Sequence, residues 1–140
     1  MIEKETGAPE ERPLISSVFH NRIKKGMKLQ SDPTILYGIF DRTGVYPKNI
    51  RKKDILEKTR YNTYSVPGLP YGPIANPGLE SLKAAVNPVV SDKYYFVSRN
   101  DGTHVFSATL KQHNLAVNKF QRNRKARQGK SWRDLKKKKK

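Results

Sequence analysis

Cysteine is absent from the 140-residue chain, and so are long apolar runs. Without cysteine there is no disulfide framework and no thiolate metal site, and three scattered histidines (His20, His104 and His113) do not make a zinc motif. No stretch of 18 apolar residues occurs and no charged-then-apolar leader opens the sequence, so we expect neither a membrane span nor an export signal within it. A chain of this length holds one small domain.

Acidic residues are also scarce, since 12 Asp and Glu stand against 29 Lys and Arg, which gives a net charge of +17. Residues 111–140 carry 13 of the basic residues and one acid, whereas residues 1–110 carry 16 basic and 11 acidic residues. The first 110 residues are therefore only mildly basic. We expect residues 121–140 to be a basic helix end followed by a disordered lysine-rich tail that attracts polyanions.

Helical spacing of apolar residues predicts a first long helix over residues 9–25, ended by Gly26. Its apolar side is expected to hold Leu14, Val18 or Ser17, and Ile23, with Phe19 between them.

Two later helices are predicted from an Asp or Asn followed by proline. Asp32 should cap a short helix over residues 33–40, and Asn76 should cap a helix that ends before residue 87. The buried face of the helix that follows Asn76 should consist of Leu79, Leu82, Ala85 and Val86. Between these helices only residues 54–58 look helical, and a connection rich in turn formers over residues 41–76 favours a functional surface over a spacer.

The C-terminal part predicts a hairpin and a last helix. Residues 94–97 and 104–106 are aromatic and β-branched, and Asp101-Gly102 should supply the positive φ angles of a tight turn between them. Thr109 and Gln112 form a capping box ahead of the last helix. Helices with a hairpin and no βαβ alternation indicate a single small α+β domain.

Few residue patterns point to catalysis. Ser16 and Ser17 neighbour His20 on one helix without a third orienting group, which disfavours a triad. The glycines near residue 70 are interleaved with prolines and form no phosphate loop. Two-carboxylate glycosidase chemistry stays open. The acids available for it are Glu3, Glu5, Glu10, Glu11 and Asp32.

Several separate motifs occur in a fixed order along the chain. They are Met1-Ile2-Glu3-Lys4-Glu5-Thr6, Ser17-Val18-Phe19-His20-Asn21-Arg22, Leu29-Gln30-Ser31-Asp32-Pro33-Thr34, Tyr61-Asn62-Thr63-Tyr64, Gly68-Leu69-Pro70-Tyr71-Gly72-Pro73-Ile74, Ala75-Asn76-Pro77-Gly78 and His113-Asn114. In this order they resemble the endolytic murein transglycosylase (YceG-like) family. The resemblance runs over residues 1–120, which look like the catalytic domain without its N-terminal part, and residues 121–140 lie outside it.

The resemblance implies a lyase that cuts peptidoglycan glycan strands internally, without water and without a cofactor, leaving 1,6-anhydro-N-acetylmuramoyl ends. One glutamate first protonates the glycosidic oxygen and then, as a carboxylate, takes the proton of the sugar's 6-hydroxyl. Such an acid needs a raised pKa.

In the family the catalytic glutamate is the second of the Glu-Lys-Glu motif, which falls on Glu5. Residues two positions apart on a helix point about 200° from each other, so Glu3 and Glu5 face different sides. Glu5 shares its side with the apolar Met1 and Ile2, which agrees with this assignment. The family's membrane anchor, wall-binding-like module and apolar lead into this helix are missing from the sequence. We therefore expect the first turn of this helix to fray, so that solvent keeps the pKa of Glu5 at about 4.3. The activity of the chain should then be low.

A carbohydrate groove needs flat rings beside amides and hydroxyls. The substrate-binding candidates in the matching motifs are Gln30, Asp32, Tyr37, Tyr61, Asn62 and Tyr64, with Asp32 also suited to a helix cap. Pro70, Gly72 and Pro73 are expected to shape a loop at the groove, and no metal ligands are expected.

The resemblance also implies peptidoglycan as substrate, cell-wall synthesis proteins as candidate partners and a location at the outer, periplasmic face of the bacterial cytoplasmic membrane. Anionic polymers or a membrane surface are the expected ligands of the lysine tail. Two alternatives stay open. One is a non-catalytic peptidoglycan-binding fragment, and the other is an RNA- or DNA-binding module with Tyr94, Tyr95 and Phe96 as its stacking platform.

Overall fold

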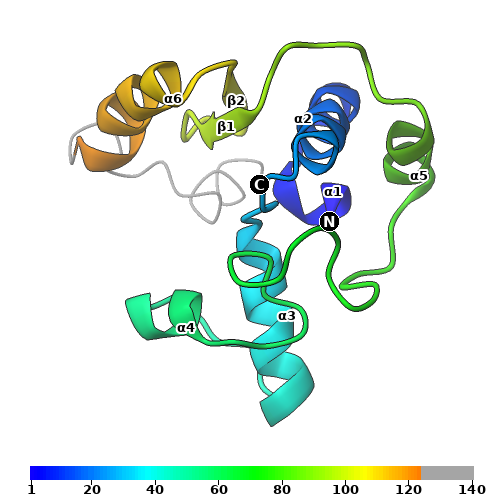
Figure 1. Ribbon diagram of the computed structural model, residues 1–140, viewed down its shortest axis with the longest axis vertical. Helices are drawn as coiled ribbons and strands as arrows, with labels where there is room; N and C mark the ends of the chain where they lie inside the picture. Colours follow the sequence, from blue (N-terminus) through cyan, green and yellow to red (C-terminus); the bar gives the residue numbers. More distant parts are fainter. Residues whose placement is uncertain (124–140) are drawn as a thin grey trace, which may run out of the picture.

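A computed structural model describes residues 1–123 and confirms the predicted α+β class (Figure 1). The predicted tail over residues 124–140 lies outside the described part. The elements are α1 (Ile2–Glu5), a 3-10 turn η1 (Pro9–Glu11), α2 (Arg12–Lys24), α3 (Asp32–Thr43), α4 (Lys52–Leu56), α5 (Leu79–Val86), β1 (Tyr95–Ser98), β2 (His104–Ser107), α6 (Leu110–Val117) and a π-helical turn η2 (Asn118–Arg122). Within residues 1–123, no helix is both long and apolar enough to cross a membrane.

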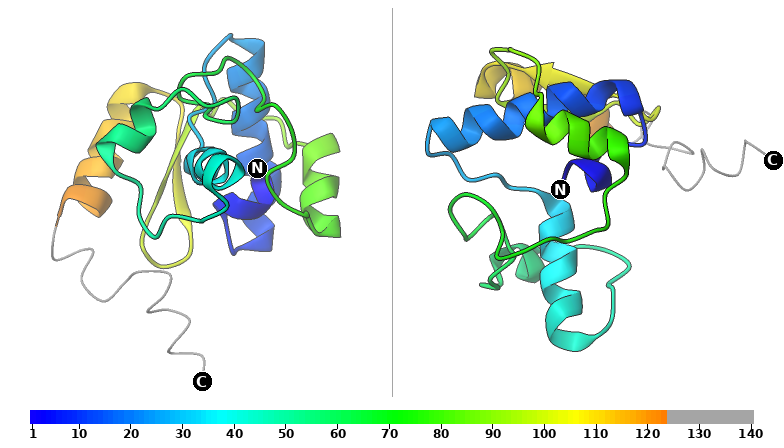
Figure 2. Two further views of the ribbon diagram at one scale, coloured as in Figure 1. Left: turned by 90° about the horizontal axis from the view of Figure 1, so that it is seen from below. Right: turned by 90° about the vertical axis from the view of Figure 1, so that its right-hand side faces the viewer.

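The short helix α1 lies between two groups of elements. On one side are α2, α5 and the hairpin with α6, and on the other are α3 and α4 (Figures 1 and 2). Helix α1 contacts both α2 and α5, and α2 also contacts β1. The first residues of the chain are therefore held both by the next helix and by α5, which comes much later in the sequence.

The main apolar core forms under α1 and α2. Ile15, Phe19 and Leu29 are buried there, and four partly buried residues pack against them, namely Met1, Ile2, Phe96 and Phe106. The predicted helix over residues 9–25 is confirmed, with Val18 and Phe19 buried. Its apolar side is rotated from the prediction, because Ile15 is fully buried and Ile23 is 42% exposed.

The N-cap residues of α3 and α5 differ from the predicted Asp32 and Asn76 by one and two positions. Ser31, not Asp32, occupies the N-cap position of α3, and Asp32 is its first helical residue. Gly78, not Asn76, precedes α5. Helix α3 also continues past the predicted end, until Gly44 ends it in the left-handed conformation with φ 71°.

Helix α5 turns its small side chains inward. Ser81 and Ala84 are buried, whereas Leu79, Leu82 and Val86 are exposed, so the predicted buried stripe is wrong. The small residues let α5 approach α1 and α2 closely, and this places its large apolar residues on the outside.

The hairpin pairs β1 and β2 antiparallel, from Tyr95 opposite Ser107 to Ser98 opposite His104. Asn100, Asp101 and Gly102 connect the strands as predicted, and the Arg99 N–H donates to the Thr103 carbonyl across the turn at 2.9 Å. The positive φ angles occur at Asn100 and Gly102 instead of at Asp101 and Gly102. The capping box of Thr109 with Gln112 is confirmed at the start of α6.

The segment between α3 and α5 contains α4 two residues earlier than predicted. The reason is a capping box in which Arg51 precedes the helix and the Asp54 carboxylate accepts the Arg51 backbone N–H at 2.7 Å. The rest of the segment is irregular and passes along α3. Gly38 of α3 permits this passage, since a Cβ there would collide with the Thr59 side chain.

Candidate active site

Two glutamates of α1 face different surroundings. The Glu3 carboxylate accepts the Ser81 hydroxyl at 2.6 Å and the Gly78 backbone N–H at 3.1 Å, and it lies 3.6 Å from Arg12. The Ser81 hydrogen bond is the largest of the effects that hold the pKa of Glu3 below its usual value. Glu3 is therefore ionised at neutral pH and ties α1 to α5.

Glu5 points instead to the start of α3, where the Ser31 hydroxyl donates to its Oε1. Burial raises the pKa of Glu5 to about 7, the nearby Asp32 charge acts in the same direction, and the Ser31 hydrogen bond opposes both. The expectation of an ordinary pKa near 4.3 is thus wrong for this structure. A carboxyl with a pKa of about 7 can both give and take a proton near neutral pH.

Asp32 and Tyr64 lie beside this carboxyl. The Tyr64 hydroxyl donates to Asp32 Oδ1 at 2.7 Å, and burial together with the Asp32 carboxylate raises the pKa of Tyr64. Asp32 is exposed and Tyr64 is half-buried. Two of the predicted substrate-binding residues thus come together next to the predicted catalytic one.

Gln30 is the third predicted residue in this region. It is exposed and adopts a φ of 51°, which is uncommon for a residue with a side chain. The buried Arg22 guanidinium holds this turn by donating to the carbonyls of Lys28 at 2.9 Å and Leu29 at 3.2 Å, and it lies 3.4 Å from Gln30 Oε1.

Tyr37, Tyr61 and Asn62 lie elsewhere. The rings of Tyr37 and Tyr61 meet edge to face at 4.7 Å, and Tyr61 is buried. Asn62 is 1% exposed, and its amide donates to the carbonyls of Ile55 and Glu57 at 3.0 and 2.7 Å. Among the described residues, none of these three side chains makes a hydrogen bond with Glu5, and Asn62 is fully used within its own loop.

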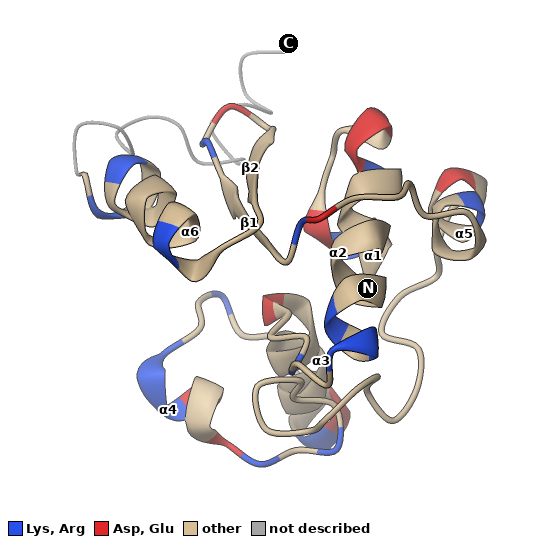
Figure 3. Ribbon diagram, turned by 45° about the horizontal axis from the view of Figure 1, so that its top comes forward, with Lys and Arg blue, Asp and Glu red and all other residues tan. Residues whose placement is uncertain are grey.

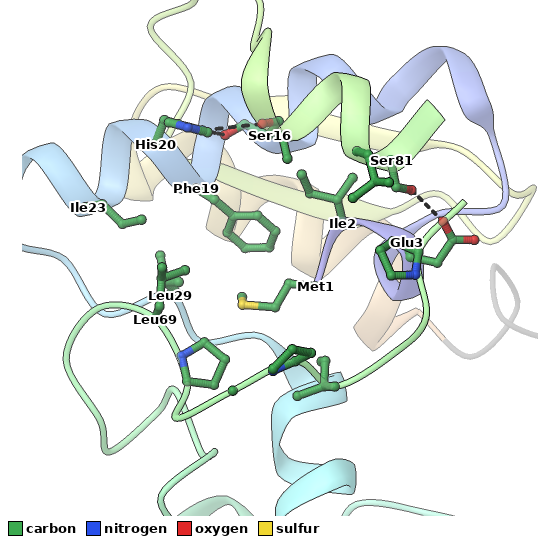
Figure 4. A pocket seen from close by; sticks show the side chains of 17 residues that line it. Met1, Ile2, Glu3, Ser16, Phe19, His20, Ile23, Leu29, Leu69 and Ser81 are labelled. Carbon is green, nitrogen blue, oxygen red and sulfur yellow. Dashed lines mark hydrogen bonds between the residues drawn. The ribbon is translucent and has the colours of Figure 1, made fainter. Parts of the chain in front are cut away.

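An apolar cavity of about 500 Å³ opens near α1, but Glu5 is not among its lining residues (Figure 4). Met1, Phe19 and Leu29 line its inner part, and Pro70, Gly72 and Pro73, which were expected to shape a loop, line its wall. A second, more polar cavity of about 520 Å³ is lined by Glu3, Lys4, Tyr37, Tyr46, Pro73, Ile74, Ala75 and Asn76.

Sequence reasoning missed two residues that hold the site, Ser31 and Arg22. A serine before Asp-Pro is typical of a helix start, and nothing in that pattern shows a hydroxyl turned toward a carboxyl 26 residues earlier. An arginine near the end of α2 is equally ordinary, since basic side chains favour helix C-termini.

Fold and site together define an α+β domain built around one protonatable glutamate. A model of the YceG-like family matches residues 1–119, and the chain belongs to that family.

Curated relatives and a solved structure agree with this membership. An endolytic murein transglycosylase of Bacillus subtilis (strain 168) is 43% identical over 120 residues, which cover 86% of this chain and 32% of that protein. An endolytic murein transglycosylase of Streptococcus pneumoniae serotype 2 (strain D39) is 37% identical over 103 residues, covering 70% and 18%. The crystal structure of a yceG-like protein from Listeria monocytogenes has a TM-score of 0.75 at 43% identity, over 82% of this chain and 36% of that one. The chain spans about a third or less of the length of these relatives.

Proposed function

We propose that this domain cleaves the glycan strands of peptidoglycan as an endolytic transglycosylase. Two similar proteins carry that activity in their names. The observation that carries the proposal is the separation of the two glutamates of α1, because burial raises the pKa of Glu5 to about 7 while hydrogen bonds lower that of Glu3. A carboxyl whose pKa lies near neutrality suits a group that must first give a proton and then take one, and Glu3, which stays ionised, does not.

In the proposed reaction Glu5 gives its proton to the glycosidic oxygen, and the bond electrons leave with that oxygen as C1 becomes cationic. The Glu5 carboxylate then takes the proton of the same sugar's 6-hydroxyl, whose oxygen bonds to C1. Glu5 is protonated again, no water is consumed, and the new end is a 1,6-anhydro sugar. Gln30, Asp32 and Tyr64 are the proposed sugar contacts. The charges of Asp32 and Glu5 act on each other and on Tyr64, and Gln30 is the exposed residue directly before Ser31, the hydrogen-bond partner of Glu5.

Asn62 is proposed as a scaffold residue, because its side-chain amide already makes hydrogen bonds within its own loop through both its nitrogen and its oxygen.

The hairpin does not support the nucleic-acid-binding alternative. Phe96 packs edge to face on Phe19, and the Tyr95 ring stacks on His113 at 5.2 Å, so neither ring is a free platform for bases.

Mass spectrometry of digested sacculi tests the reaction. Incubation with the protein should produce fragments ending in 1,6-anhydro-N-acetylmuramic acid. Fragments that carry an added water at the cleaved sugar would contradict the proposal and indicate a hydrolase, in which Asp32 is the second carboxylate.

A further inference from the structure

Ser31 occupies a helix N-cap position without capping the helix. At this position a serine oxygen normally accepts a backbone N–H from the first turn. Here Ser31 has extended backbone angles, φ −94° and ψ 115°, yet its side chain makes no capping hydrogen bond with α3. Its hydroxyl is directed to Oε1 of Glu5 instead.

Two buried threonines fix the Ser31 backbone. The Ser31 N–H donates to Thr63 Oγ1 at 3.0 Å, and the Ser31 carbonyl accepts the Thr34 hydroxyl at 2.6 Å. The Thr34 proton is therefore used, so in the 2.9 Å contact between the two threonine hydroxyls Thr63 is the donor. The Thr63 N–H completes the set by donating to Thr34 Oγ1 at 3.1 Å. Each of these hydroxyl protons has a partner, and the Ser31 hydroxyl is left for Glu5.

One oxygen of the Glu5 carboxyl, Oε1, therefore accepts a hydrogen bond, and the other, Oε2, has no hydrogen-bond partner among the described residues. Among residues 1–123, Ser31 is the single hydrogen-bond partner of this carboxyl, and it reaches Oε1. A hydroxyl that donates to Oε1 favours the acid proton on Oε2. The same bond strengthens when the carboxyl ionises, because the acceptor becomes charged.

We propose that Ser31 is the positioning residue of Glu5: it orients the carboxyl through Oε1, directs the exchanged proton to Oε2 and stabilises the carboxylate between the two proton transfers. The catalytic part of this statement rests on the proposed function. The ring of Thr34 and Thr63 makes the arrangement rigid, since it joins the start of α3 to the loop that carries Tyr64.

The test is the titration of Glu5, read by NMR of the full chain with glutamate side-chain carboxyls labelled with ¹³C and assigned through Glu5→Gln. Ser31→Ala should move the Glu5 midpoint upward by about one pH unit, because the lost hydrogen bond stabilises the carboxylate more than the neutral acid. Ser31→Thr keeps the donor and should titrate like wild type. Ser81→Ala is the matched control, because it removes the equivalent hydroxyl from Glu3 and should leave the Glu5 midpoint unchanged.

Activity on sacculi gives the second reading. A rate that requires protonated Glu5 falls as pH rises through its pKa, so Ser31→Ala should shift this alkaline limb upward by the same amount while lowering the maximal rate, and Ser31→Thr should restore both. If Ser31→Ala folds poorly, Ser31→Cys can replace it, because cysteine has a similar volume but its thiol is a weak hydrogen-bond donor. The Glu5 midpoint of Ser31→Cys should also lie above that of the wild type.

The possible failures are distinguishable. Equal Glu5 midpoints in wild type, Ser31→Ala and Ser31→Cys would overturn the role of Ser31 even if anhydro products form. A wild-type protein that forms no anhydro ends would overturn the proposed function, and the NMR titration would still decide whether Ser31 controls this carboxyl.

Discussion

Glu3 and Glu5 are separated by one residue, yet they differ in protonation near neutral pH, because Glu3 is ionised whereas Glu5, with a pKa of about 7, is only partly ionised. Glu3 receives three stabilising partners from α2, α5 and the residue before α5, whereas Glu5 is desolvated and receives one hydroxyl. The helical turn creates this difference by pointing the two side chains to different neighbours. The chemistry of the domain is therefore set by which element each side chain of α1 meets.

The raised pKa of Glu5 predicts a stability difference that depends on pH. Its folded pKa of about 7 lies above the ordinary value of 4.5, so the folded protein binds the proton more tightly and loses stability as pH rises through this window. Glu5→Gln removes the titration. The wild type and the variant should be similarly stable below pH 4.5, and at pH 8 the wild type should be less stable by about 3 kcal/mol.

Urea denaturation of both proteins across this pH range measures that difference. Other titrating groups contribute equally to both proteins and cancel in the comparison. A constant difference between the two curves from pH 4 to pH 8 would show that the pKa of Glu5 is not raised in the folded state.

At the residue scale the sequence motif indicated Glu5, and helix periodicity separated it from Glu3. Ser31 could not be found in the same way. Its local pattern, a serine before Asp-Pro, satisfies the rules for a helix start. The departure from those rules becomes visible only when α3 and α1 are placed together, which is a long-range property.

At the element scale, Arg22 joins α2 to the turn that follows it and to the distant residues at the start of β1. From α2 its Nε donates to the Tyr94 carbonyl at 2.6 Å, its Nη1 donates to the Lys28 and Leu29 carbonyls, and its guanidinium lies 5.1 Å from the centre of the Tyr95 ring. It thus fixes β1 and the turn of Gln30 against α2.

Arg22→Lys should therefore destabilise the domain by about 3 kcal/mol, because a lysine cannot serve these carbonyls together and they are left buried without donors. Arg42→Lys is the control, since Arg42 is exposed and pairs with Glu57 at the surface, and it should change stability by less than about 0.5 kcal/mol. Equal unfolding free energies for both variants in urea would contradict the structural role of Arg22.

Elements were predicted best where local chemistry alone determines them. The capping box of α6 and the end of α5 before Asn87-Pro88 were predicted correctly, because neighbouring residues make them. The buried face of α5 was predicted wrongly, because apolar periodicity assumes that large residues face the core. In α5 the close contact with α1 and α2 selects Ser81 and Ala84 instead.

At the scale of the whole molecule, Glu5 lies where two groups of elements meet. Helix α1 is packed against α2 and α5 on one side, and its Glu5 reaches Ser31 at the start of α3 on the other (Figures 1 and 2). Lys and Arg are spread over several elements, among them α2, α4 and α6, and Asp and Glu are scattered as well (Figure 3). The acid is thus placed by long-range packing and not by a charged patch.

The most direct test of this account compares Glu5→Gln with Glu3→Gln on purified sacculi, with anhydro ends counted by mass spectrometry and folding checked by circular dichroism. Glu5→Gln keeps the shape of the side chain but cannot exchange a proton, so it should fold and lose about 10²- to 10⁴-fold in rate. Glu3→Gln weakens the link between α1 and α5, so it should melt earlier while retaining measurable activity. Wild-type activity in Glu5→Gln, or loss of activity in well-folded Glu3→Gln alone, would contradict the assignment of Glu5 as the acid and base.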